Sequence, residues 1–109
     1  MIIRAVRRRL RTILERRLGV PSVPAALAHL HRQGFSPTTV FDVGAYRGDF
    51  ARTCLARWPA ATVACFEPQR RMTALLESAA AATAGRIRVF PVLLGSSEQS
   101  RVTLHEVET

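Results

Sequence analysis

Two acidic residues, Asp42 and Glu67, stand at the ends of two short apolar runs that are typical of buried strands. Gly44 and Gly48 lie between them in a stretch that opens a helix. The carboxyl ends of parallel strands meet at one edge of a sheet, which is where α/β folds bind their ligands. Acids at two consecutive strand ends, with a glycine turn between them, therefore predict the front half of a nucleoside-binding unit.

The turn lacks the marks of a phosphate site. No Gly-Lys-Ser/Thr follows it, which excludes a P-loop. The dinucleotide fingerprint needs glycine at its first, third and sixth places, and these places hold Gly44, Tyr46 and Asp49. An acid two residues before Gly44 would also repel a pyrophosphate. The pattern favours a ligand with a positive group and no phosphate, and S-adenosylmethionine, which carries a sulfonium and an ammonium, is such a ligand.

The spacing suggests a role for each residue. Gly44 and Gly48 let the backbone approach the ligand and let the helix pack on the strand. Glu67 is placed to accept two hydrogen bonds from a ribose diol, an interaction on the order of 1.5–3 kcal/mol when the acceptor is charged. In the alternative interpretation, Asp42 only caps the helix turn and Glu67 is a solvated strand end.

The elements that must position these residues alternate between helix and strand. Helices are expected from Ser22 to Gly34, from Gly48 to Pro59, and after Pro68. The expected strands are Thr39–Val43, Thr62–Phe66, Ile87–Leu94, and a short fourth one in which Val102 and Leu104 alternate with polar residues. The fourth strand is expected to pair with the third as an antiparallel hairpin.

This order predicts an α/β fold with a mainly parallel sheet and right-handed crossovers. Pro91, within the expected third strand, cannot donate to a ladder, so that strand belongs at a sheet edge and the order becomes 3-2-1. The first strand is then expected to be central in a larger sheet. We therefore expect residues 22–109 to be the front part of a larger domain, and an unpaired first strand to favour self-association.

The motifs resemble those of one family. The stretches are Gly34-Phe35-Ser36-Pro37, Val40-Phe41-Asp42-Val43-Gly44-Ala45, Gly48-Asp49-Phe50, Ala64-Cys65-Phe66-Glu67-Pro68 and Leu93-Leu94-Gly95-Ser96. Together they look like the FkbM family of S-adenosylmethionine-dependent methyltransferases, over residues from about 27 to the C-terminus. One departure is Tyr46, where the family commonly has asparagine.

The resemblance implies a Rossmann-like class I methyltransferase fold and, as the usual activity, O-methylation of a small-molecule or saccharide acceptor. The family domain continues past residue 109, so the resemblance covers its cofactor-binding part, and no catalytic base is identified in these residues. The candidate cofactor-binding residues are Asp42, Gly44, Ala45, Tyr46, Gly48, Glu67 and Pro68.

The N-terminal arm, residues 1–21, has a different character. All sixteen basic residues of the chain are arginine, and residues 1–17 hold seven of them against Glu15, a net +6 of the total +8. Residues 2–18 place apolar side chains at three- and four-residue steps, which predicts an amphipathic helix with a basic face. This helix is expected to dock on the domain or to contact an anionic membrane. RNA is less favoured because no aromatic residues accompany the arginines.

Localisation follows from simpler features. No secretory signal and no 18-residue apolar span is present, so a cytoplasmic, at most membrane-peripheral, location is expected. Cys54 and Cys65 lack metal-site spacing, so they are expected to be buried free thiols. The alternative to a methyltransferase is a non-catalytic, truncated remnant whose arginine-rich arm binds membrane or RNA.

Overall fold

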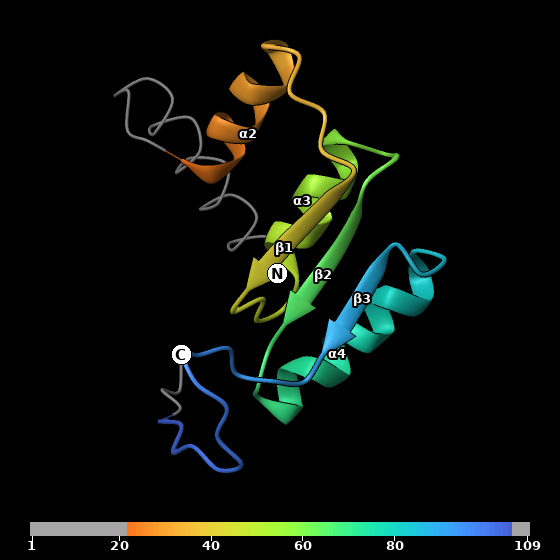
Figure 1. Cartoon of the computed structure of the whole chain (residues 1–109). Coiled ribbons are helices and arrows are strands. Elements are labelled where there is room, and N and C mark those ends of the chain that lie inside the picture. Colours follow the sequence, from red (N-terminus) through yellow and green to blue (C-terminus); the bar gives the residue numbers. More distant parts are fainter. Residues whose placement is uncertain (1–21, 106–109) are drawn as a thin grey trace, which may run out of the picture.

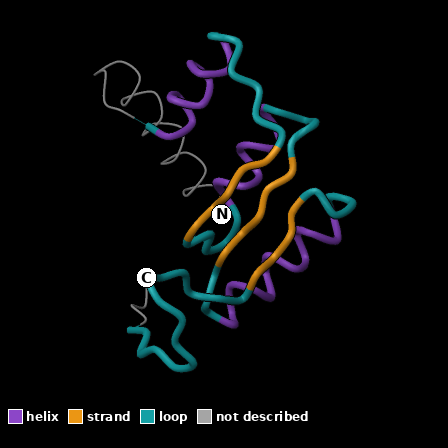
Figure 2. Tube along the Cα trace, in the orientation of Figure 1, coloured by secondary structure: helices purple, strands orange, loops and turns teal. Residues whose placement is uncertain are grey.

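A computed structural model describes residues 22–105, which form a small α/β domain (Figure 1). Its three strands are β1 (Thr39–Val43), β2 (Thr62–Phe66) and β3 (Ile87–Phe90), and its helices are α2 (Val23–Arg32), α3 (Asp49–Arg57) and α4 (Arg70–Ala82). The strands are parallel, in the order β1-β2-β3 (Figure 2). The predicted α/β class, parallel pairing and 3-2-1 order of these strands are therefore confirmed. The predicted helix at 2–18 lies outside the described residues.

Helix α2 begins and ends where its capping residues predict. The Ala25 N–H donates to Ser22 Oγ at 3.2 Å, and Gly34, with φ +86°, turns the chain out of the helix. None of the residues of α2 is buried; Leu27 packs against the core, and the His31 ring lies 6.2 Å from the ring of the buried Trp58. Helix α2 therefore covers little of the core.

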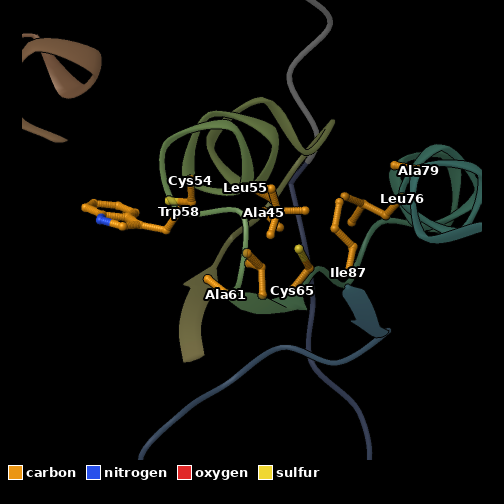
Figure 3. Packing of buried hydrophobic residues seen from close by; sticks show 11 residues of the cluster. Ala45, Cys54, Leu55, Trp58, Ala61, Cys65, Leu76, Ala79 and Ile87 are labelled. Atoms are coloured by element: carbon orange, nitrogen blue, oxygen red, sulfur yellow. The ribbon is translucent and has the colours of Figure 1, made fainter. Parts of the chain in front are cut away.

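Helices α3 and α4 cover one face of the sheet, and the core lies between them and the strands (Figure 3). On the side of α3 that faces the sheet, Cys54, Leu55 and the following Trp58 are all buried. Trp58 also donates from Nε1 to the Phe35 carbonyl oxygen at 2.8 Å. This hydrogen bond connects the segment that follows α2 with the C-terminal end of α3. On α4, Leu76 is fully buried whereas Leu75 is exposed.

The other face of the sheet is open among the described residues. Phe41 and Val43 of β1 are 71% and 63% exposed on that face. The rings of Phe41, Phe66 and Phe90 form a row across the three strands, with centroid separations of 5.9 and 5.1 Å. Within residues 22–105, β1 is an edge strand, and its outer backbone groups have no ladder partner, as predicted for this part of the chain.

The predicted hairpin at the C-terminal end is wrong. Strand β3 ends at Phe90 instead of Leu94, and residues 91–105 contain no strand. Pro91 lacks the N–H that would extend the ladder, and the Val92 N–H donates back to the Phe90 carbonyl at 2.8 Å, which turns the chain away. The alternation of Val102 and Leu104 therefore finds no pairing partner. No helix in the described part of the chain is long and apolar enough to cross a membrane.

Candidate functional site

The turn between β1 and α3 folds back over the carboxyl end of β2. The N–H groups of Gly44 and Ala45 both donate to the Phe66 carbonyl oxygen, at 2.8 and 3.2 Å, and the Gly48 N–H donates to Ala45 O at 3.0 Å. Three alternate residues, Gly44, Tyr46 and Gly48, have positive φ values of 77°, 52° and 87°. This coiled path brings the end of β1, where Asp42 lies, next to the end of β2, where Glu67 follows.

Glu67 clamps the turn in a way that the sequence did not reveal. Its Oε1 accepts from the Tyr46 N–H and its Oε2 from the Gln69 N–H, both at 2.9 Å, and the residue is only 3% exposed. The interpretation of Glu67 as a solvated strand end is therefore wrong. Each carboxylate oxygen retains a second lone pair, so the clamp leaves acceptor capacity for a ligand hydroxyl.

Asp42 is the electrostatically unusual residue of the site. It is 8% exposed, and its Oδ2 is buried without a hydrogen-bond partner in the described structure. Burial raises the pKa of the Asp42 carboxyl, and the nearby negative charge of Glu67 raises it further. The helix that follows begins at Gly48 without a side-chain cap, so the alternative that Asp42 caps it is wrong.

The two glycines serve different purposes. A Cβ on Gly48 would lie 2.9 Å from Leu76 Cδ2, so glycine at this position allows α4 to pack against the turn. A Cβ on Gly44 would meet nothing within 4 Å. The backbone at Gly44 is thus open to an approaching molecule, as predicted for a ligand-facing turn, while Gly48 is required by packing.

The remaining candidate residues, Ala45, Tyr46 and Pro68, differ in how much of each side chain is exposed at the turn. Ala45 is buried in the core, so only its backbone is available to a ligand. Tyr46 is half-buried, with the Arg47 guanidinium 5.2 Å from the centre of its ring. Pro68 is half-buried between Glu67 and the start of α4. The backbone of the turn and the Glu67 side chain are therefore brought together, whereas the side chains of Ala45 and Pro68 offer no polar group to a ligand.

Two thiols lie on the buried side of the same sheet. Cys54 and Cys65 are free and buried, as predicted. Burial and the neighbouring Asp42 carboxylate raise both pKa values, that of Cys65 to about 11. Both groups therefore stay protonated near neutral pH, which rules them out as nucleophiles. Residues 22–105 hold no group of three His, Cys, Asp or Glu side chains arranged for a metal ion.

Two surface hollows in the described part lie away from Asp42, Gly44 and Glu67. One of about 470 Å³ runs between the start of α3 and the outer side of α4, and is lined by Arg47, Asp49, Arg52, Leu75, Ser78, Ala79 and Ala82. The other, of about 210 Å³, is formed by residues between 93 and 102. In the first hollow, Arg52 is paired with Asp49 at 3.4 Å and with the Arg47 carbonyl oxygen. Neither hollow is lined by Asp42, Gly44 or Glu67, so neither extends the site at the strand ends.

A scan against protein-family models finds no match for this chain, and a search of curated proteins finds none either. The likeness to FkbM methyltransferases therefore rests on the motifs themselves, as they stand between residues 34 and 96.

Proposed function

We propose that this chain binds S-adenosylmethionine through the turn at 42–48 and Glu67, as the cofactor-binding part of a Rossmann-like methyltransferase acting on an acceptor oxygen. The observation that carries the proposal is the buried Asp42 oxygen without a donor. A buried, unpaired acceptor costs on the order of 1–3 kcal/mol, or more for a charged group, so it needs an explanation, and a ligand that pairs with Asp42 supplies one. The adjacent open backbone at Gly44 gives a ligand access.

The negative charges of Asp42 and Glu67 favour a ligand that carries a positive charge. Asp42 and Glu67 lie close enough for the charge of Glu67 to raise the pKa of Asp42, in addition to the larger effect of burial. A phosphate beside two acids would be repelled, whereas an ammonium or sulfonium would be attracted and would favour the ionised form of Asp42. The residues present therefore fit a cationic nucleoside better than a nucleotide.

Each residue has a defined part in binding. Asp42 offers its free oxygen to the positive group, and the Gly44 backbone allows close approach without a side chain. Glu67 holds the turn through the Tyr46 N–H and keeps lone pairs for the ribose hydroxyls. When bound, the cofactor supplies a methyl group activated by the sulfonium. The acceptor, a small molecule or a saccharide, is part of the proposal by resemblance. The proposed location, cytoplasmic or membrane-peripheral, is the one expected from the sequence.

Calorimetry with S-adenosylmethionine tests the assignment on the full chain. Glu67→Ala is expected to weaken affinity by roughly ten- to a hundredfold, because a charged acceptor worth about 1.5–3 kcal/mol is lost. Asp42→Asn is expected to weaken it as well, and Gly44→Val to abolish it by filling the open space. Asp49→Asn, an exposed acid on the same turn, is the matched control and should bind normally.

Two results would count against the proposal. Unchanged affinity in both Asp42→Asn and Glu67→Ala would remove the site assignment. Failure of the unaltered, folded chain to bind any S-adenosylmethionine would favour the remnant interpretation, in which the fold is retained without its cofactor.

A further inference from the structure

The open face of the sheet is a feature that the proposed function does not use. It presents Phe41 and Val43 of β1 and the rings of Phe66 and Phe90 on the side opposite to the buried Val63 and Cys65. The register places Val43, Phe66 and Phe90 side by side at the carboxyl ends of the three strands. Residues 91–105 leave the β1 part of this face uncovered, since Phe41 is 71% exposed.

The chain itself contains a segment whose pattern complements this face. Within residues 2–18, one predicted helical side carries the apolar side chains Ile3, Val6, Leu10, Ile13 and Leu14, with Arg7 at its border. Arg4, Arg8 and Arg11 fall on the opposite side. An amphipathic helix needs an apolar surface to cover its stripe, and a sheet face needs a helix or second sheet to cover it.

The dimensions of the two surfaces agree. From Ile3 to Leu14 the stripe rises by eleven residues, about 17 Å at 1.5 Å per residue. Strand β1 has five residues, which at about 3.3 Å each also span about 17 Å. The distance from β1 to β3 is two strand spacings, about 10 Å, which matches the diameter of one helix. One helix is therefore enough to cover the aromatic row.

The connection is also short enough and on the correct side. Figures 1 and 3 both place α2 on the β1 flank of the sheet, away from β3 and α4. Residues 19–21 lie between the predicted helix, which ends at residue 18, and Ser22, where the described residues begin. Fully extended, the four Cα–Cα steps from residue 18 to Ser22 reach about 13 Å, more than the roughly 10 Å that separates packed layers. The arm can thus pass around the β1 edge to the open face.

The charges on the two surfaces indicate which side of the predicted helix would face the sheet. The strand residues on the open face include Arg88 and no acid, so nothing there attracts the arginines of the arm. The arginine side of the helix is left in water, where it adds to solubility. We propose that residues 2–14 dock as a helix on the open face of the sheet, with their apolar stripe over Phe41, Val43 and Phe66. The proposal does not depend on cofactor binding.

Photo-cross-linking on the full chain tests this contact. A benzophenone analogue of phenylalanine replaces Phe41, and the products of irradiation are mapped by mass spectrometry. Cross-links to residues 2–14 at the mass of a single chain are expected. Leu10→Asp combined with Leu14→Asp should lower their yield by roughly tenfold or more, because two buried leucines are lost. Arg8→Gln combined with Arg11→Gln should leave the yield unchanged.

The control places the same analogue at Leu75, which is exposed on α4 on the far side of the sheet and should not reach the arm. Products at the mass of two chains would mean that a second copy covers the face. Products on residues 91–105 would mean that the C-terminal segment covers it. Either outcome overturns the proposal. Three further results would also overturn it: a cross-link to the arm that persists in the chain with both aspartate substitutions, a yield of arm cross-links from position 75 equal to that from position 41, or no cross-link from position 41.

Discussion

Replacing Asp42 by asparagine is expected to stabilise the fold at neutral pH. The Asp42 Oδ2 is buried and has no donor in the described structure, and Glu67 places a second negative charge nearby. Asparagine has the same shape and no charge, so it removes the repulsion and most of the desolvation cost. A substitution that stabilises the fold is expected when a residue serves binding at the expense of stability.

The sign of the pH dependence follows from the raised pKa. Because folding raises the Asp42 pKa above its ordinary 3.8, the native state holds this proton more tightly than the unfolded chain does. The associated stability is present below pH 3.8 and is lost as the pH rises through the folded-state pKa. Asp42→Asn should therefore match the unaltered chain near pH 4 and exceed it at pH 8 by about 1–3 kcal/mol, the usual cost of a buried unpaired acceptor.

Urea denaturation of both chains at pH 4 and pH 8 measures this difference. With a slope of about 1 kcal/mol per M for a small domain, the midpoint at pH 8 should rise by about 1 M or more. Asp49→Asn, an exposed acid paired with Arg52, should change the stability by less than about 1 kcal/mol at either pH. A midpoint difference that is the same at both pH values, or a less stable Asp42→Asn chain at pH 8, would refute the electrostatic account.

Three further predictions concern the clamp, the glycines and the thiols. Glu67→Ala should lower the free energy of unfolding by about 3 kcal/mol or more, because two N–H groups lose a charged acceptor, and urea denaturation measures the loss. Gly48→Ala should be more destabilising than Gly44→Ala by about 1–3 kcal/mol: both carry backbone strain, but only at position 48 does the new Cβ meet a neighbour; equal thermal shifts would contradict this. Cys54 and Cys65 should resist a thiol-specific dye at pH 8 in the folded chain and react fully in denaturant, and rapid labelling of the native protein would show that they are not buried.

The convergence of Asp42, Glu67 and the glycine turn could be predicted from the sequence, but the contacts of these residues could not. The acids and glycines converge because strand ends in a parallel sheet meet at one edge. The clamp by Glu67 could not be read from sequence, because its two donors, the N–H groups of Tyr46 and Gln69, lie 21 residues back and two residues ahead. Its one local signal is an acid three residues before Arg70, the first residue of α4, where backbone N–H groups are unpaired.

Local patterns determined the elements of this protein. Apolar runs, the cap at Ser22 and the breaks at Gly34 and Pro59 are short-range features, and they decide where α2, α3 and the first two strands begin and end. The parallel pairing and its order also followed, since helices between strands permit few arrangements.

Tertiary structure decided what local patterns leave open. Whether an alternating segment becomes a strand depends on a partner edge, which Val102 and Leu104 lack, and on Pro91, which ends β3 early. Whether an acid is solvated or buried depends on the elements packed around it, and these bury Asp42 without a donor and Glu67 with two. Pairing and burial are long-range properties, so only the assembled sheet and its helices could settle them.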